Sequence, residues 1–184
     1  MRKSYLSLVL ILCLLLTGCG GSREMKSAYD DFSAELSRAE CLSFKVKLRA
    51  EYEHKTALFG LSYTEDAEGA VVTVESPSLI AGISARVEKG GTKLEFGDIS
   101  LDTGDLNEHG LSPMSSLPML VKALKEGCPD SFWTEDGKRV VQLIPDDNII
   151  CTVWFSSDMT PLRAEIISDG RVTVYAEISD WATS

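Results

Sequence analysis

The architecture of this chain follows from one segment, Phe44-Lys45-Val46-Lys47-Leu48-Arg49-Ala50-Glu51-Tyr52-Glu53. Apolar side chains occupy its even-numbered positions and charged side chains its odd-numbered ones. Because successive side chains of a strand point to opposite faces, this alternation predicts a strand with one buried and one solvated face. Such strands are typical of antiparallel sheets that cover a core with one face and contact water with the other.

Segments rich in apolar and β-branched residues, separated by turn residues, predict the other strands of the sheet. They are residues 58–64, 70–75, 83–88, 93–96, 99–101, 131–134, 139–144, 149–155, 162–168 and 172–178. Short connectors such as Asp169-Gly170 are typical of tight turns between neighbouring strands. We therefore expect a meander in which consecutive strands pair antiparallel.

Two segments repeat apolar side chains at three- and four-residue spacing and predict helices. The first spans residues 23–40, and the second lies within residues 113–126 and stops at Gly127. Two amphipathic helices beside one large sheet predict an α+β fold. We expect a curled antiparallel sheet, an open half-barrel, with the helices covering its concave face, in a single domain over residues 23–184.

The amino terminus has the composition of an export signal. Arg2 and Lys3 precede the apolar run Leu6–Leu16, which is too short to span a membrane as a helix. The run ends in Leu16-Thr17-Gly18-Cys19, which resembles the bacterial lipobox.

That resemblance implies cleavage after residue 18 and attachment of a diacylglycerol to Cys19. Residues 1–18 would then be a signal peptide and residues 19–22 a lipidated tether. The expected location is the extracytoplasmic face of a cell membrane, held there by the lipid. The sequence leaves open whether the cell has one membrane or two.

The order of elements in the mature chain resembles the bacterial lipoprotein-carrier (LolA-like) fold. The local matches are Val72-Thr73-Val74-Glu75-Ser76-Pro77 leading into Leu79-Ile80-Ala81-Gly82, then Gly110-Leu111-Ser112-Pro113 before a helix, and Pro161-Leu162-Arg163-Ala164-Glu165-Ile166 in the closing hairpin. The chain is also similar to uncharacterised lipoproteins of spore-forming Gram-positive bacteria, some with a role in germination. Because the carrier itself is not lipidated, the resemblance does not extend to shuttling between two membranes.

The resemblance implies a non-enzymatic binding protein that holds a lipid or acyl chain in the half-barrel. The residues expected to line its apolar cavity are Phe44, Val46, Leu48, Leu79, Ile80, Ile83 and Trp154. An alternative hypothesis is a structural partner whose cavity is filled by its own side chains. Its outer surface would then hold a cell-wall or spore-cortex enzyme at the membrane.

Charge and motif content narrow the possible activities. Loss of Arg2 and Lys3 with the signal leaves 16 basic against 28 acidic residues, a net charge of −12. An acidic protein is not attracted to phosphate backbones, so nucleic acid is not an expected partner. His54 and His109 are isolated, and Asp102-Thr103-Gly104-Asp105 and Asp146-Asp147-Asn148 lack the full calcium-binding loop pattern. We expect no catalytic residue, no metal and no cofactor.

Three cysteines remain in the mature chain besides Cys19, namely Cys41, Cys128 and Cys151. An odd number in an exported protein allows one internal disulfide with a free thiol, or a bridge between two chains. The alternative is three small buried side chains, since free cysteine is among the most buried residue types. The sequence favours burial, most clearly for Cys151, which lies within a predicted strand.

Overall fold

The computed structural model describes residues 20–52, 55–88, 91–104 and 112–184. Its helices are α2 (Gly20–Arg38) and α3 (Pro113–Glu126). Its strands are β1 (Leu42–Tyr52), β2 (Lys55–Asp66), β3 (Gly69–Ser76), β4 (Ser84–Glu88), β5 (Gly91–Phe96), β6 (Ile99–Gly104), β7 (Pro129–Glu135), β8 (Lys138–Asp146), β9 (Ile149–Phe155), β10 (Pro161–Ser168) and β11 (Arg171–Thr183).

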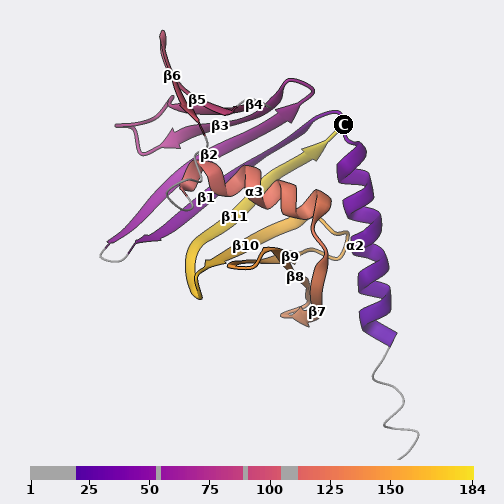
Figure 1. Cartoon of the computed structure of the whole chain (residues 1–184). Coiled ribbons are helices and arrows are strands. Elements are labelled where there is room, and N and C mark those ends of the chain that lie inside the picture. The colour runs from indigo at the N-terminus through magenta and orange to yellow at the C-terminus, as the bar shows by residue number, and fades with distance from the viewer. Residues whose placement is uncertain (1–19, 53–54, 89–90, 105–111) are drawn as a thin grey trace, which may run out of the picture.

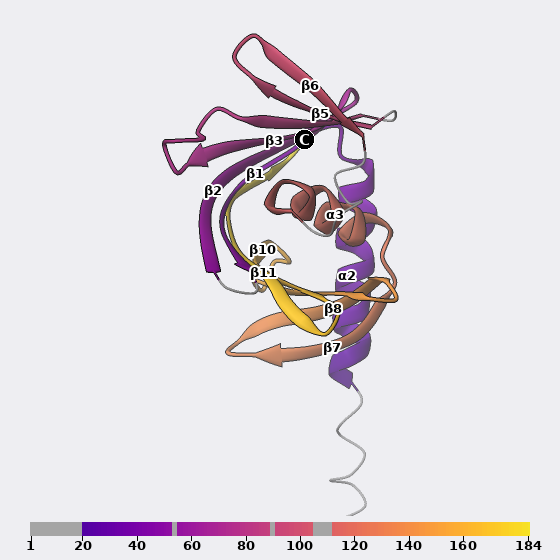
Figure 2. The ribbon, with the colours of Figure 1, turned by 60° about the vertical axis from the view of Figure 1, so that its left-hand side comes forward.

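The described strands form one antiparallel sheet in the order β6-β5-β4-β3-β2-β1-β11-β10-β9-β8-β7. Consecutive strands are neighbours except β6 and β7, which form the two edges of the sheet. At its centre β1 pairs with β11, the last strand of the chain. The sheet curls without closing, and both helices lie on its concave side (Figures 1 and 2). The predicted α+β half-barrel with helices on the concave face is confirmed.

β1 has the two faces that its alternation predicts. Phe44, Val46 and Leu48 are at most 3% exposed and belong to the main core, whereas Lys45 and Lys47 between them are exposed. β1 lies between β2 and β11, so both of its backbone edges are paired. The apolar side chains of the concave face and of the two helices form the core, and the charged convex face contacts water.

α2 packs an aromatic side of its surface against the C-terminal half of the sheet. Tyr29 and Leu36 are 1% exposed, and the Phe32 ring lies 5.2 Å from that of Phe155 on β9. The helix begins at Gly20, so Gly20-Gly21-Ser22, which belong to the predicted lipidated tether, are helical. Glycine weakens a helix by only about 1 kcal/mol, so an established helix can extend over this segment.

α3 begins and ends at the predicted residues because its boundaries are encoded locally. Ser112 caps the helix: its Oγ accepts from the Ser115 amide, and the Ser115 hydroxyl accepts from the Ser112 amide. Pro113 follows as the first helical residue, where a missing N–H costs nothing. Leu117, Leu120 and Leu124 then point into the core with at most 1% exposure.

Removal of this cap tests how far α3 depends on it. We expect Ser112→Ala to lower the free energy of unfolding by about 1 kcal/mol, because the Ser115 amide loses its acceptor. Ser157→Ala, an exposed serine in the turn before β10, should change it by less than about 0.5 kcal/mol. Urea unfolding followed by tryptophan fluorescence measures both. Equal losses in the two variants would contradict a stabilising cap.

Candidate apolar binding site

The inner face of the half-barrel is built from rows of paired residues that run across the strands. One row contains Tyr63, Val72, Ala85, Leu94 and Leu101, each paired with the next on the neighbouring strand. Residues paired in this way share a face of the sheet. Because Val72 is in the core, Leu94 and Leu101 also face the concave side.

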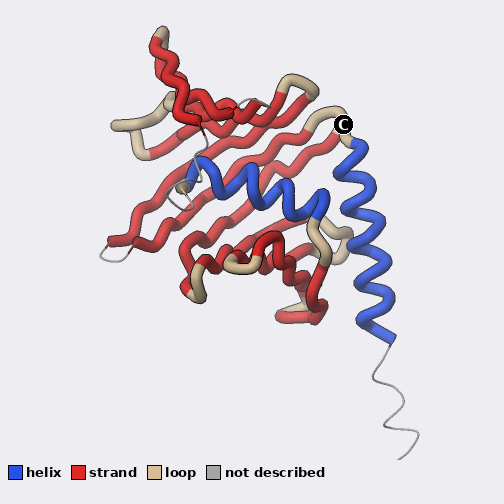
Figure 3. The backbone as a smooth tube through the Cα atoms, viewed as in Figure 1, coloured by secondary structure: helices blue, strands red, loops and turns tan. Residues whose placement is uncertain are grey.

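The helices cover only part of these rows. Val72 and Ala85 are fully buried, but Leu101 at the end of the row is 60% exposed. Phe96 and its partner Ile99 are 52% and 70% exposed. Figure 3 shows α3 crossing the middle of the sheet while β4–β6 extend beyond it. We name this surface the open strip, defined by the exposed Phe96, Ile99 and Leu101 together with the partly buried Ile83 and Leu94.

A hollow of about 970 Å³ lies beside α3, next to the open strip. Its sheet wall includes Tyr63, Ala70, Val87 and Thr92, and its helix wall includes Ser115, Pro118, Met119 and Lys122. Ala70, Val87 and Thr92 form the row next to the one that ends in Leu94 and Leu101. Thr92 and Leu94 are two residues apart on β5, so the hollow and the open strip are about 7 Å apart.

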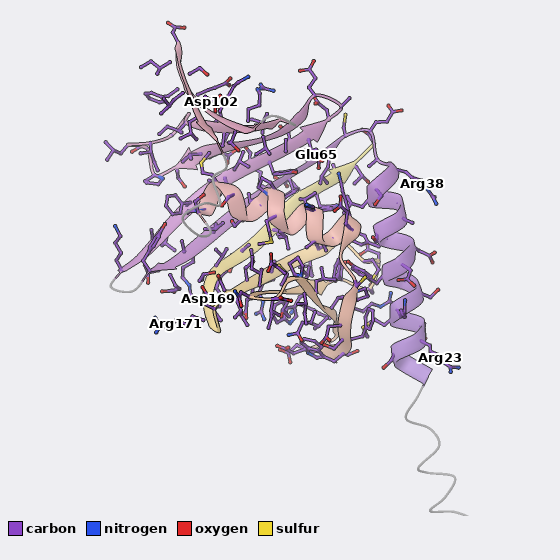
Figure 4. All side chains as sticks on the ribbon, viewed as in Figure 1. Arg23, Arg38, Glu65, Asp102, Asp169 and Arg171 are labelled. Carbon is purple, nitrogen blue, oxygen red and sulfur yellow. The ribbon has the colours of Figure 1, made fainter. Side chains whose placement is uncertain are left out.

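The C-terminal end of α3 is tied to both neighbouring elements. From α2, the Tyr29 hydroxyl donates to the Leu124 carbonyl at 3.2 Å and Ser33 Oγ donates to the Lys125 carbonyl at 3.0 Å. On the other side, Lys125 Nζ lies 2.9 Å from Glu65 Oε2 on β2. Figure 4 labels Glu65, which lies beside α3. These contacts fix the wall of the hollow that α3 provides.

Two tyrosines of this region hold their protons strongly. Burial raises the pKa of Tyr29 well above its ordinary value. Burial also raises the pKa of Tyr63, and the negative charge of Glu65, whose Oε2 accepts a hydrogen bond from the Tyr63 hydroxyl at 3.0 Å, raises it further. Both hydroxyls therefore remain hydrogen-bond donors at neutral pH.

The seven residues predicted to line a cavity occupy different environments. Phe44, Val46 and Leu48 are buried in the core beneath the helices, and Ile80 and Ile83 are partly buried against it. Leu79 is 90% exposed in the turn before β4. Of the seven, only Ile83 belongs to the open strip.

Trp154 lies on the opposite face of the sheet, which corrects its predicted place in the cavity. Its neighbours Val153 and Phe155 belong to the core, so Trp154 points to the convex side, where the Arg163 guanidinium lies 3.7 Å from its ring. The segment 149–155 is apolar except for Thr152, and such a run does not reveal which side chains face inward.

Sequence reasoning missed Phe96, Ile99 and Leu101 as site residues. A signal was present, because apolar residues at 94, 96, 99 and 101 flank Gly97-Asp98 symmetrically. This pattern predicts a hairpin with one apolar face. It does not tell whether a helix covers that face.

The cysteines divide into two kinds. Cys151 is buried as predicted, and its thiol lies 3.8 Å from the Met119 sulfur. Burial raises the pKa of Cys151 to about 12, so the thiol is unreactive at neutral pH. Cys41 and Cys128 are exposed, which corrects the expectation of burial. No disulfide joins the cysteines of the described residues.

Several predicted features lie outside the described residues, among them Cys19, His54 and His109. Within residues 20–52, 55–88, 91–104 and 112–184, no three histidine, cysteine or acidic side chains come together as a metal site would require. Asp146-Asp147-Asn148 belongs to the end of β8 and the turn into β9.

Neither described helix combines the length and apolar character needed to cross a bilayer.

No protein-family model matches the chain, and no curated protein does. Among solved structures, the chain is similar to a DUF1329 family protein from Desulfovibrio piger, with a TM-score of 0.51, 9% identity, and coverage of 87% of this chain and 93% of that one. A LolA superfamily protein from Nitrosomonas europaea has a TM-score of 0.48 and 11% identity, with coverage of 86% of this chain and 93% of that one. The lipoprotein LppX from Mycobacterium tuberculosis has a TM-score of 0.41 and 14% identity, with coverage of 86% of this chain and 95% of that one. At these identities the likeness concerns the fold alone.

Proposed function

We propose that this chain is a membrane-anchored extracytoplasmic lipoprotein that binds an apolar ligand, a lipid or an acyl chain, without catalysing a reaction. The ligand lies on the open strip and reaches into the adjacent hollow. A diacylglycerol on Cys19 anchors the protein. The observation that carries the binding proposal is the exposure of Phe96, Ile99 and Leu101 on the inner face, which is otherwise the core side of the sheet.

The physical reason for binding is the uncovered apolar area. An acyl chain on the open strip removes water from both surfaces, and each buried methylene contributes about 0.8 kcal/mol. The hollow extends the apolar contact through Val87, Met119 and Ile149. A pocket with mostly pre-formed walls and a few polar groups is the usual form of a small-molecule site.

The first residues of α2 and the open strip lie at opposite ends of the described part of the molecule. Cys19 directly precedes α2, which is about 28 Å long. In both ribbon views β6 lies near the end of the molecule opposite the first residues of α2 (Figures 1 and 2). The strip therefore lies on the far side of the molecule from the first residues of α2, the helix that follows the proposed anchor residue in the sequence.

Charged substitutions in the open strip test the binding proposal. We expect Ile99→Glu with Leu101→Glu to weaken binding of the neutral apolar dye 1-N-phenylnaphthylamine at least roughly tenfold, because carboxylates must be desolvated against the ligand. Folding should be retained, since both side chains are already mostly exposed. Dye fluorescence titration of residues 20–184 measures the affinity. This fragment contains every residue of the described core.

The matched control is Leu58→Glu, because Leu58 is 71% exposed but pairs with Arg49 on the convex face. It should bind the dye like the unmodified chain. A wild-type protein that binds no dye, or a control that loses binding to the same extent, would rule out a site on the open strip. Native mass spectrometry of the same fragment should also detect a copurified lipid.

A second candidate function is a structural partner that holds a cell-wall or spore-cortex enzyme at the membrane. It is favoured by the filled inner face beneath α3, where Phe44, Val46 and Leu48 are core residues. In that case native mass spectrometry should show a protein without lipid, and a pull-down from envelope extracts should recover one stoichiometric partner. Lipid in the purified protein together with no partner would exclude this candidate.

A further inference from the structure

We propose that the hollow beside α3 binds the polar head group of the ligand, and that this head group is cationic. The inference rests on the proposed function, because it extends the acyl site of the open strip by a second subsite. Its first basis is position. The row of inner-face residues next to the strip lines the hollow. An acyl chain lying on Leu94 and Leu101 therefore brings its polar end to Thr92 and Val87.

The second basis is the charge around the hollow. Its lining carries the carboxylates of Glu65, Asp66, Glu68, Glu126 and Asp146, against the ammonium groups of Lys122 and Lys125. Lys125 and Glu65 neutralise each other at 2.9 Å, with both side chains less than 30% exposed. The four remaining carboxylates, all on exposed residues, therefore outnumber the one remaining lysine, Lys122, which is also exposed.

The third basis is the orientation of α3. The hollow includes Glu126 and Gly127, the last residue of α3 and its cap. The C-terminal end of a helix carries about half a negative charge from its aligned peptide dipoles. Ser115, in the first turn of α3, lines the other end of the hollow. At the C-terminal end of α3 the backbone and the side chains thus create a potential of the same sign, which attracts a cation and repels a carboxylate or a phosphate.

The apolar part of the hollow places a limit on the ligand. The apolar side chains of Val87, Met119 and Ile149 line it together with the polar residues. A small inorganic cation would make no favourable contact with these apolar side chains. The matching ligand is an amphipath in which an acyl or alkyl chain continues directly into a primary or quaternary ammonium group.

Two probes of equal chain length test the inference on residues 20–184. Isothermal titration calorimetry compares dodecyltrimethylammonium with dodecanoate, each below its micelle-forming concentration, and the neutral dye reports on the apolar site independently. The cationic probe should bind roughly fivefold more tightly at low ionic strength, because the carboxylates are exposed and exposed ion pairs are weak. The preference should shrink in 1 M salt, where the Debye length is about 3 Å.

Two triple variants with the same change in net charge locate the effect. Glu68→Gln, Glu126→Gln and Asp146→Asn remove three carboxylates from the hollow and should abolish the preference. Asp31→Asn, Asp130→Asn and Glu177→Gln remove three exposed carboxylates that do not line the hollow and should retain it.

The outcomes separate the two proposals. Equal binding of both probes with normal dye binding overturns the cationic subsite and leaves the acyl site intact. Loss of preference in both triple variants shows a general charge effect and also overturns it. Failure of all three probes to bind the unmodified fragment overturns the proposed function itself.

Discussion

Replacement of Phe155 by alanine is expected to lower the free energy of unfolding by about 4 kcal/mol. Phe155 is fully buried, with its ring 5.2 Å from that of Phe32 and 6.3 Å from that of Tyr29. The substitution leaves a cavity where β9 and α2 meet, and the surrounding aromatic rings cannot collapse into it without losing contacts. Urea unfolding monitored by tryptophan fluorescence gives the value.

Phe96→Ala is the matched substitution on the open strip. Because Phe96 is 52% exposed, the loss of stability should be about 1 kcal/mol or less. Binding of the neutral dye should instead decrease. If Phe155→Ala proves too unstable to purify, Phe155→Leu should show a loss of about 1–2 kcal/mol and keeps the comparison measurable. Equal destabilisation by Phe96→Ala and Phe155→Ala would mean that the strip is part of the core.

The protein is expected to lose stability steeply at alkaline pH. Burial raises the pKa of Cys151 from near 9 to about 12, and the pKa values of Tyr29 and Tyr63 are raised above their ordinary value near 10. Below about pH 8 these groups are protonated in both the folded and the unfolded chain, so they add no pH dependence. Above it the unfolded chain releases protons that the folded chain keeps, and stability falls as pH rises.

The size of this effect follows from about 1.4 kcal/mol per group for each pH unit. Between pH 8 and pH 11 the three groups together predict a loss on the order of 5 kcal/mol. Urea unfolding at pH 8, 9.5, 10 and 11 tests it. Cys151→Val should reduce the fall in the free energy of unfolding between pH 9 and 10. Cys128→Val, which replaces an exposed thiol, should not. A flat profile up to pH 11 is the contrary result.

The sequence predicted the elements well where the signal was local. The alternation from Phe44 to Tyr52 indicated the two faces of β1, and the structure agrees for all of these positions except Tyr52, which is 43% exposed near the end of the strand. Ser112, Pro113 and Gly127 marked the ends of α3, because capping depends on a few adjacent residues.

The candidate site was predicted less well. Trp154 lies within a strand that is apolar on both faces, so no alternation showed that it points outward. Phe44, Val46 and Leu48 were correctly expected on the concave face, but the two helices cover them. Burial of an inner-face residue depends on whether a helix passes over it, and that is a property of packing between segments distant in sequence.

The sequence by itself therefore determined the fold class: strands with one apolar face, turns between them, and two amphipathic helices that must cover part of that face. The tertiary structure alone decided the pairing of β1 with β11 and the crossing of α3 over only the middle of the sheet. The second of these features leaves Phe96, Ile99 and Leu101 exposed. The physical reason is that periodicity specifies the face to which a side chain points, whereas the extent of its cover is set by contacts between distant parts of the chain.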